Sequence, residues 1–470
     1  MLQNLLACAT ASLAVTFALP SSAADGSPDP GFGIAGISYV ATDDVSARSI
    51  YPHVTIELPD GKLLFAGARN KVVPPAPFYE PQIRGALVRL NADGSPDATF
   101  GNTTIDGLHE LPDLVTGTRM QGIESIARFP DGSYVAVGTG MVNQPIQGYV
   151  VKLTAGGDVD ENFGNAGVVL MPMTYLHTVK LDSQQRIVVG GEHFDNVAFV
   201  YTTTLARLDG TGAYDTTFGD AGVKTIEWSD PNSSGYVDDL AIVDGDAIVV
   251  GGGFEANGPG LGNDYALARL KNDGSFDTTF ATVGWRVFHD PSETSVTSRI
   301  ERIVPRADGR IAFAGYHNTS DNITGLVFGR VNADGSTDTS FGQAANPGYF
   351  KPAILPVAES ADATGLIVQP DGKMIASVAY YTPEKENFIA VRTLADGSGL
   401  DPTFADDGVF EADLAPTGIY SEIDTLSLQQ DGRIVAAGRA QRTTGSALVD
   451  FAAMRLLNPS ADVIFANGFD

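Results

Sequence analysis

Cysteine is almost absent from this sequence, since Cys8 is the only one among 470 residues. Disulfide bonds, thiol catalysis and cysteine-based metal sites are therefore excluded for the chain beyond that position. A chain of this length can bury a core large enough to fold without disulfide bonds.

Helical periodicity and the common catalytic motifs are also absent. Short apolar runs alternate with turns rich in Gly, Asp, Asn and Pro, and the chain has 53 Gly and 26 Pro. This pattern predicts an all-β protein. There is no Gly-x-Ser-x-Gly elbow, no P-loop and no His-Glu-x-x-His motif, and the six histidines are scattered. No catalytic residue is therefore predicted, and the question of enzymatic activity stays open.

Basic residues are scarce, with 29 Lys and Arg against 57 Asp and Glu and a net charge of −28. An acidic surface repels the phosphate backbone, so nucleic acid is excluded as a partner. The charge is compatible with solubility outside the cell and with cation binding.

Residues 1–24 lack Asp, Glu, Lys and Arg and contain an apolar stretch from Leu5 to Leu19. Small residues follow, so this segment is predicted to be a secretory signal peptide, although it has no Lys or Arg at its start. The alternative, an uncleaved anchor, is disfavoured because the apolar stretch is short for a bilayer span. Lipidation at Cys8 is not expected. We expect an exported protein, in the periplasm, at the cell surface or outside the cell. Residues 25–470 would form one domain without a transmembrane span.

An Asp-x-x-Phe motif, called the anchor below, recurs along the whole chain. Its Phe residues are 55 to 68 positions apart, so eight anchors bound seven repeats of about sixty residues. The anchors are Asp29/Phe32, Asp97/Phe100, Asp160/Phe163, Asp215/Phe218, Asp277/Phe280, Asp338/Phe341, Asp401/Phe404 and Asp462/Phe465.

Each repeat contains four short strand patterns, including a hairpin such as "LIVQPDGKMIASV" at 366–378. Such repeats predict a seven-bladed β-propeller with four antiparallel strands per blade. A linear solenoid would need capping repeats. The chain has a surplus strand at 36–41 and none after its last anchor. The N-terminal strand is therefore expected to pair with the C-terminal blade, Ile37 to Val40 against Ala452–Leu456, and to close the ring.

The stretches "VQPDGKMIASV" and "LARLKNDGSFDTTF" resemble the delta-60 repeat family, and the resemblance covers residues 25–470. It implies an exported bacterial protein with a propeller-like fold and no established reaction. Gln184-Gln185 in one hairpin and Val378, where Gly is usual, depart from the pattern.

A basic residue lies seven to nine positions before each of the last seven anchor aspartates. We interpret these as structural ion pairs, because a basic ring for an anion would be neutralised by the acids in the same register. In the anchor turn the carboxylate is expected to cap backbone N–H groups and the Phe to be buried between blades. The pairs are Arg89/Asp97, Lys152/Asp160, Arg207/Asp215, Arg269/Asp277, Arg330/Asp338, Arg392/Asp401 and Arg455/Asp462.

Asn91, Asp93, Ser95 and Asp97 place oxygen atoms at alternate positions, as in calcium loops. Gly94 and the lack of a distal Glu do not fit an EF-hand, so turn chemistry is the preferred interpretation. No cofactor is predicted, and Ca²⁺ is kept as the alternative.

A second set of polar residues appears when the first hairpin strands of the repeats are aligned. These residues are expected to converge at the mouth of the central channel. There they would cap loops and line a wet rim, hold a ligand or metal, or act as acid and base. The long loops 70–85 and 253–265 are expected on the same face, and 103–122 is a further long insertion. The aligned positions are Val54 (beside His53), Glu124, His177, Asp238, Glu301, Thr364 and Asp424.

Three functions follow from these observations. The leading hypothesis is a monomeric binding module for a protein or glycan ligand. The first alternative is an extracellular hydrolase or lyase acting on carbohydrate, and the second is a structural component of the cell envelope.

Overall fold

The computed structural model describes residues 25–41, 47–73, 80–114, 120–141, 146–172, 174–228, 233–256, 263–289, 297–318, 324–354, 360–381, 387–405, 407–415, 420–441 and 449–459. The predicted signal peptide and the last anchor, Asp462 and Phe465, lie outside these ranges. So do residues 74–79, 115–119 and 257–262 of the three long loops.

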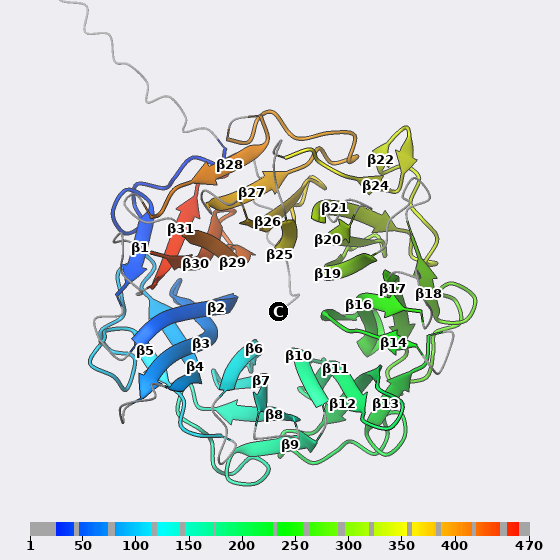
Figure 1. The fold of residues 1–470 in the computed structure, drawn as a ribbon, viewed down its shortest axis with the longest axis horizontal. Coiled ribbons are helices and arrows are strands. Elements are labelled where there is room, and N and C mark those ends of the chain that lie inside the picture. The colour runs from blue at the N-terminus through cyan, green and yellow to red at the C-terminus, as the bar shows by residue number, and fades with distance from the viewer. Residues whose placement is uncertain are drawn as a thin grey trace, which may run out of the picture.

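The described residues form β-strands and one short 3₁₀ turn, η1 (Asp244–Asp246), so the prediction of an all-β protein is confirmed. Four-stranded antiparallel groups, called blades here, stand around a common centre (Figure 1). In this part of the chain no helix has the length and apolar character needed to cross a bilayer.

The strands follow one another from the centre of the molecule outward in each blade. In the first half of the chain they are β2 (Ala47–Glu57), β3 (Leu63–Val73), β4 (Glu80–Leu90) and β5 (Leu108–Glu110); β6 (Met120–Arg128), β7 (Tyr134–Met141), β8 (Ile146–Leu153) and β9 (Val168–Pro172); and β10 (Thr174–Leu181), β11 (Ile187–Asp195), β12 (Val200–Leu208) and β13 (Val223–Ile226).

The second half repeats the arrangement. Its strands are β14 (Ser234–Gly235), β15 (Asp239–Val243), β16 (Ala247–Glu255), β17 (Asn263–Leu270) and β18 (Trp285–Phe288); β19 (Thr297–Pro305), β20 (Ile311–Asn318), β21 (Thr324–Val331) and β24 (Tyr349–Phe350), with the small hairpin β22 (Gly342–Gln343) and β23 (Asn346–Pro347); β25 (Ser360–Val368), β26 (Met374–Tyr381), β27 (Phe388–Arg392) and β28 (Val409–Ala412); and β29 (Ser421–Leu428), β30 (Ile434–Ala440) and β31 (Asp450–Leu456).

The N-terminal strand β1 (Ile37–Val40) supplies the fourth strand of the β29–β31 blade. It pairs antiparallel with β31, with Ile37 opposite Met454 and Val40 opposite Phe451. This is the pairing predicted from the surplus strand. The two ends of the described chain therefore share one sheet (Figure 1).

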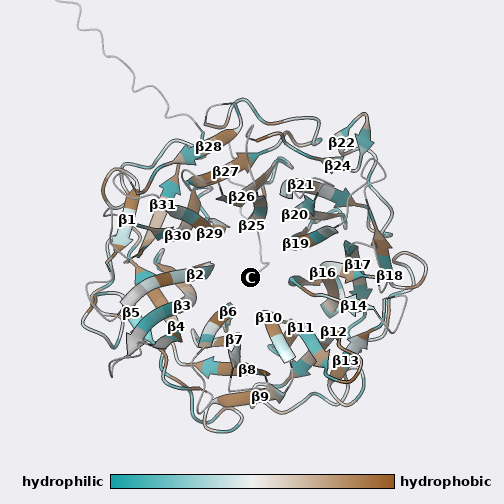
Figure 2. Cartoon of the chain, viewed as in Figure 1, coloured by the Kyte–Doolittle hydropathy of each residue, from teal (hydrophilic) through white to brown (hydrophobic). Residues whose placement is uncertain are grey.

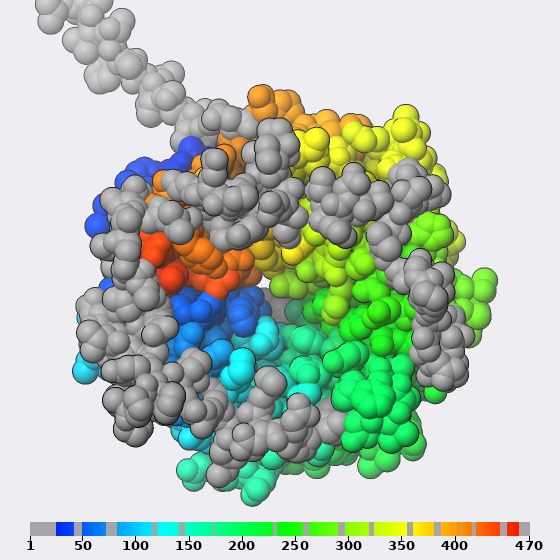
Figure 3. Space-filling model, viewed as in Figure 1, coloured from blue at the N-terminus to red at the C-terminus, as the bar shows by residue number. Residues whose placement is uncertain are grey.

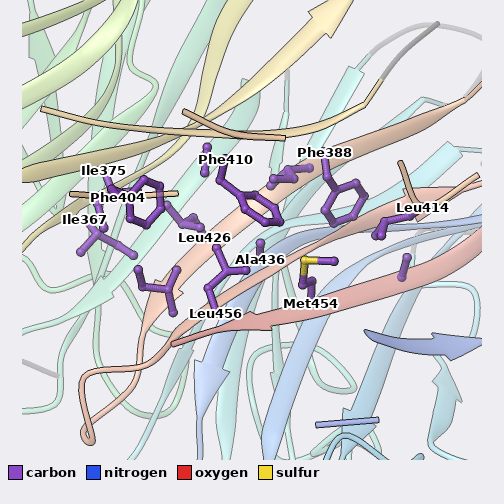
Figure 4. Packing of buried hydrophobic residues seen from close by; sticks show 14 of the residues in the cluster. Ile367, Ile375, Phe388, Phe404, Phe410, Leu414, Leu426, Ala436, Met454 and Leu456 are labelled. Carbon is purple, nitrogen blue, oxygen red and sulfur yellow. The ribbon is translucent and has the colours of Figure 1, made fainter. Parts of the chain in front are cut away.

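Hydrophobic side chains pack between neighbouring blades. One cluster joins the β25–β28 blade to the β29–β31 blade, with Phe388, Phe404 and Phe410 on one side and Met454 and Leu456 on the other (Figure 4). In Figure 2 the outer strand β9 is largely hydrophobic, whereas the inner strand β19 carries hydrophilic residues. The inner strands therefore leave polar side chains near the centre of the molecule.

The anchor turns have the local structure expected from the sequence. Oδ1 of the anchor aspartate accepts the backbone N–H two residues later, as in Asp97 with Thr99 at 3.0 Å and Asp277 with Thr279 at 3.0 Å. The anchor Phe side chains among the described residues are all buried. Each of several anchors also bonds to the turn of the next repeat, as when Gly219 N donates to Asp273 O at 2.9 Å. The repeated turn thus ties one blade to the next.

Candidate functional site

The inner strand of nearly every blade is interrupted by a β-bulge at the same place. One residue is skipped in the pairing of β2, β6, β10, β19, β25 and β29 with their neighbours. In the remaining blade Asp238 lies in the gap between β14 and β15, and its N–H donates to Gly251 O at 3.0 Å. A bulge re-aims the side chain of the extra residue. The skipped residues are His53, Glu124, His177, Glu301, Thr364 and Asp424.

These bulge side chains converge on one cavity of about 240 Å³, the central cavity. Figure 3 shows the hollow at the centre of the face in view. The cavity brings together all six candidate residues chosen from the sequence. In the first repeat the lining residue is His53 and not the aligned Val54, because the bulge shifts the register by one residue. The lining residues are His53, Glu124, His177, Asp238, Glu301, Arg302, Ala363, Thr364 and Asp424.

A glycine in the second strand of most blades makes room for the bulge. A Cβ atom at these positions would lie 1.8 to 2.1 Å from a carbonyl oxygen of the inner strand, two residues before the bulge residue. The sixth repeat has Val378 here and still forms the bulge at Thr364. This recurring glycine is a signal in the sequence from which the bulge could be predicted. The alignment of the first hairpin strands did not use it. The glycines are Gly67, Gly138, Gly191, Gly252, Gly315 and Gly438.

His53 and Glu124 form an ion pair across two blades. His53 Nδ1 lies 3.3 Å from Glu124 Oε2 and 2.8 Å from the carbonyl oxygen of Ile123, to which it donates. Burial opposes the charge on His53, but the Glu124 carboxylate outweighs it and raises the pKa of the imidazole. Burial likewise opposes the charge on Glu124, and His53 lowers the pKa of that carboxyl. The ion pair therefore favours the charged form of both side chains.

His177 is held by a buried carboxylate. Its Nε2 lies 2.6 Å from Glu192 Oε2, while Glu192 Oε1 accepts the backbone N–H of Val237 in the next blade at 2.7 Å. Burial opposes the charge on His177, but Glu192 raises the pKa of the imidazole to about 9. The Glu192 side chain thus orients His177 and joins two blades.

Asp238 is engaged by a bidentate guanidinium. Arg299 Nε and Nη2 lie 2.5 and 2.7 Å from the two carboxylate oxygens of Asp238. The Arg299 guanidinium also lies over the Tyr236 ring, 4.5 Å from its centroid. Burial raises the pKa of Asp238, and Arg299 acts against that increase.

Burial strongly raises the pKa of two carboxyl groups of the cavity, Glu301 and Asp424. Burial, together with the nearby Asp362 carboxylate, raises the pKa of Glu301 to about 8. Among the described residues Glu301 Oε2 has no hydrogen-bond partner and no contact with solvent. Burial raises the pKa of Asp424 to about 7 although Arg439 Nε lies 3.6 Å away. Glu301 is therefore largely protonated at neutral pH and can donate a hydrogen bond.

Thr364 contributes a neutral hydroxyl group. Its Oγ1 donates to the Ile423 carbonyl at 2.8 Å and lies 2.8 Å from Ser377 Oγ. It contacts the next blade as His53 does, through the carbonyl that precedes the bulge.

Sequence reasoning missed the basic residues around the cavity. Arg302 lines the cavity directly. Arg299 and Arg439 lie beside two acids of the lining, Asp238 and Asp424. The site is therefore a mixed set of donors and acceptors, with basic as well as acidic side chains. Within the described ranges no group of three or more His, Asp or Glu side chains has the arrangement of a metal site. The signal that could have found Arg302 is its place directly after the aligned Glu301.

The basic and acidic residues predicted to pair in the anchor turns lie together in six repeats. The Arg pairs join Nε to Oδ2, whereas Lys152 Nζ is farther from its partner. The distances are 2.7 Å for Arg89/Asp97, 3.7 Å for Lys152/Asp160, 2.8 Å for Arg207/Asp215, 2.7 Å for Arg269/Asp277, 2.5 Å for Arg330/Asp338 and 2.8 Å for Arg392/Asp401.

For the seventh basic residue the structure shows a partner that was not predicted, and the predicted pair itself stays a prediction. Arg455 Nε lies 2.8 Å from Asp29 Oδ2 and thus pairs with the first anchor, whereas the predicted partner Asp462 is outside the described residues. The reason is the pairing of β1 with β31, which brings the N-terminal segment to the last blade. Arg392 is likewise bonded to Asp25, at 2.8 Å.

Family comparison agrees with this architecture. Residues 58–100, 130–163, 247–280 and 306–341 match a family described as "Domain of unknown function (DUF5122) beta-propeller". The fold is a β-propeller. The matched segments contain the anchors Asp97/Phe100, Asp160/Phe163, Asp277/Phe280 and Asp338/Phe341 of four of the repeats. No curated protein matches the chain.

Solved structures resemble the β-propeller at low similarity. The polysaccharide lyase Uly1 is 10% identical, with a TM-score of 0.45, over 87% of this chain and 90% of its own. A GH93 α-L-arabinofuranosidase of Fusarium graminearum, in complex with arabinobiose, is 8% identical with a TM-score of 0.41 over 74% and 97%. An α-L-arabinanase of Penicillium chrysogenum is 11% identical with a TM-score of 0.39 over 73% and 95%. At these scores the resemblance carries no argument about activity.

Proposed function

We propose that this protein is an exported, closed seven-bladed β-propeller of the delta-60 type that binds a small, hydroxyl-rich ligand in its central cavity. The observation that carries the proposal is the convergence of the bulge side chains on one cavity. A bulge at the same position in successive blades gives each blade one side chain in the site. Residues 1–24 would be the signal peptide, and the mature protein a monomer.

The chemistry of the lining favours a neutral polar ligand. His53 and Glu124 neutralise each other, and His177 and Asp238 are paired with Glu192 and Arg299. Protonated Glu301 and the Thr364 hydroxyl add uncharged hydrogen-bonding groups. Hydroxyl groups of a sugar both donate and accept hydrogen bonds, so they match such a mixed lining.

The test is a thermal-shift titration with monosaccharides, short oligosaccharides and Ca²⁺. A Glu124→Gln/Asp238→Asn double variant should lose the shift that a sugar produces in the wild type. Glu227→Gln, on an exposed side chain outside the cavity, is the matched control and should keep it. If the wild type and the double variant respond alike to every ligand, the cavity is not the binding site. A shift with Ca²⁺ alone would instead favour the cation-binding alternative.

A second candidate function is cleavage of carbohydrate at the same cavity. It is favoured by one observation: Glu301 has a pKa raised to about 8, while the pKa of Glu124 in the same cavity is lowered. Two carboxyl groups whose pKa values are moved apart can serve as general acid and general base. Release of reducing ends from a polysaccharide by the wild type, lost in Glu301→Gln with binding retained, would support it. Absence of release across a broad panel would leave the binding function alone.

A further inference from the structure

Five aromatic rings form a continuous chain that ends beside the central cavity. Phe199 contacts Phe194 with ring centroids 6.4 Å apart, and Phe194 contacts Tyr201 at 5.1 Å. Tyr201 in turn lies 5.7 Å from Tyr236 and 6.0 Å from Tyr175. We call these five residues the aromatic platform.

The platform is continuous with the cavity through two of its members. Tyr175 and Tyr236 stand two residues before His177 and Asp238, which line the cavity. The Arg299 guanidinium, which forms an ion pair with Asp238, lies over the Tyr236 ring. The platform thus joins side chains of the β10–β13 blade to Tyr236 of the next blade, beside the cavity residues.

The outer end of the platform is exposed. The Phe199 side chain is 76% accessible and that of Val197 is 84% accessible. Large apolar side chains exposed together on a soluble protein mark binding surfaces more often than isolated ones do.

The turn that presents Phe199 is built in an unfavourable conformation. Phe199 has φ of 58°, in the left-handed region that bulky side chains rarely adopt. Asp195 holds the turn, because its Oδ1 accepts the N–H groups of Val197 and Ala198 at 2.7 and 3.0 Å and its carbonyl accepts Phe199 N at 2.8 Å. Strain that surrounding contacts maintain is a recurrent feature of ligand sites.

We infer that the ligand of the central cavity is an oligosaccharide whose further sugar rings stack on the aromatic platform. This inference rests on the proposed function. The C–H face of a sugar ring is apolar and flat enough to lie on an aromatic ring, while the hydroxyl groups at its edge remain free for polar contacts. A cavity lined by polar groups beside a row of aromatic rings suits a chain of such sugars, with one end in the cavity and the rest along the platform.

The experiment compares ligand length with platform substitutions. Calorimetric titration uses glucose, xylose and mannose and the corresponding β-1,4-linked hexasaccharides, with the full mature chain. We expect at least one hexasaccharide to bind more tightly than its monosaccharide. Phe199→Ala should weaken the hexasaccharide by about tenfold and leave the monosaccharide unchanged. Val283→Ala, at an exposed valine outside the platform and outside the cavity lining, is the matched control and should keep wild-type affinity.

Other outcomes overturn the inference and remain distinguishable from failure of the proposed function. Equal hexasaccharide affinity in the wild type and Phe199→Ala refutes the platform, while loss of monosaccharide binding in Glu124→Gln/Asp238→Asn would still uphold the cavity. Length-dependent binding that needs Phe199 but not the cavity residues upholds the platform and refutes the cavity. If Phe199 is needed only for capture of another protein, or if no sugar binds, the oligosaccharide inference is wrong.

Discussion

The anchor turns and the central cavity are built by the same repeat, yet they repeat in different ways. At the anchors the same residue types recur and make the same bonds: Arg pairs with Asp, and the Arg guanidinium lies 4.1 to 5.1 Å from the centroid of the anchor Phe in six repeats. At the cavity the position recurs, through the bulge, while the side chain changes between His, Glu, Asp and Thr. A region that joins blades requires fixed partners, whereas a region that faces a ligand requires only a fixed backbone.

The basic residues of the anchor pairs also make contacts between blades. Arg207, Arg269 and Arg330 each reach the turn of the following repeat, with Nη1 2.7, 2.6 and 3.2 Å from Asn272 Oδ1, Ala333 O and Ala395 O. The cavity residues also contact neighbouring blades, but the type of contact differs from one residue to the next. Breaking the anchors should therefore cost stability, and changing the cavity should mainly alter binding.

The largest expected effect is that of removing residues 25–41 from the mature chain. The deletion takes away β1, the buried Phe32 and the carboxylates of Asp25 and Asp29, and leaves Arg392 and Arg455 buried without these partners. We expect the free energy of unfolding to fall by more than about 5 kcal/mol, or cooperative folding to be lost. Urea denaturation followed by circular dichroism measures it. An unchanged midpoint would contradict a closed ring.

Arg392→Ala should have the next largest effect. The Arg392 side chain is 1% exposed and stands between Asp25 and Asp401, so its loss leaves two buried carboxylates, with Lys373 3.0 Å from Asp401 as the nearest remaining cation. We expect a loss of about 3–5 kcal/mol in unfolding free energy.

Lys152→Ala is the matched control for that substitution. Lys152 and Asp160 are 3.7 Å apart and 19% and 26% exposed, so the expected loss is under about 1 kcal/mol. Equal losses in the two variants would show that burial does not set the strength of the anchor pairs.

Gly191→Ala tests the backbone that places the cavity residues. A Cβ at this position would lie 1.8 Å from the carbonyl oxygen of Tyr175, so the bulge at His177 must shift. We expect a loss of about 1–3 kcal/mol in stability together with weaker ligand binding. Gly210→Ala, with no atom within 4 Å of the added methyl group, is the control and should change neither. Unchanged stability and binding in Gly191→Ala would show that the glycine is not required for the bulge.

The effect of pH on stability separates the two regions by sign. Burial raises the pKa of Glu301 from 4.5 to about 8, so the stability of its protonated form is fully present below pH 4.5 and is lost as the pH rises to 8. Glu301→Gln should therefore stabilise the protein at pH 8 by on the order of 4 kcal/mol, at about 1.4 kcal/mol for each pH unit between the two pKa values, and have little effect at pH 4. Urea denaturation at both values checks this. A gain of the same size at pH 4 would contradict it.

The anchors should respond in the opposite direction. Burial opposes the charge on Asp215, but Thr217 and Arg207 lower the pKa of the carboxyl from 3.8 to about 2. The stability that this pair contributes is present above pH 3.8 and is lost as the pH falls through 2. Asp215→Asn should therefore flatten the acid limb of the stability curve and leave the limb between pH 5 and 8 unchanged. A change in stability confined to the alkaline side of the curve would contradict this prediction for the anchor pair.

The sequence by itself determined the repeat, the all-β class, the strand that joins the two ends, and the residues that converge on the central cavity. It could do so because a repeated unit must place equivalent residues at equivalent positions, so one aligned column, from Glu124 to Asp424, becomes one ring of side chains. Tertiary structure alone decided what surrounds them. That Asp29 pairs with Arg455, that His53 and not Val54 lines the cavity, and that Arg299 and Arg439 lie beside the acids Asp238 and Asp424 all depend on contacts that only the folded chain makes. Such contacts are set by how neighbouring blades pack, which leaves no periodic trace in the sequence, and by the register shift at the bulge, for which the recurring glycine is the sequence signal.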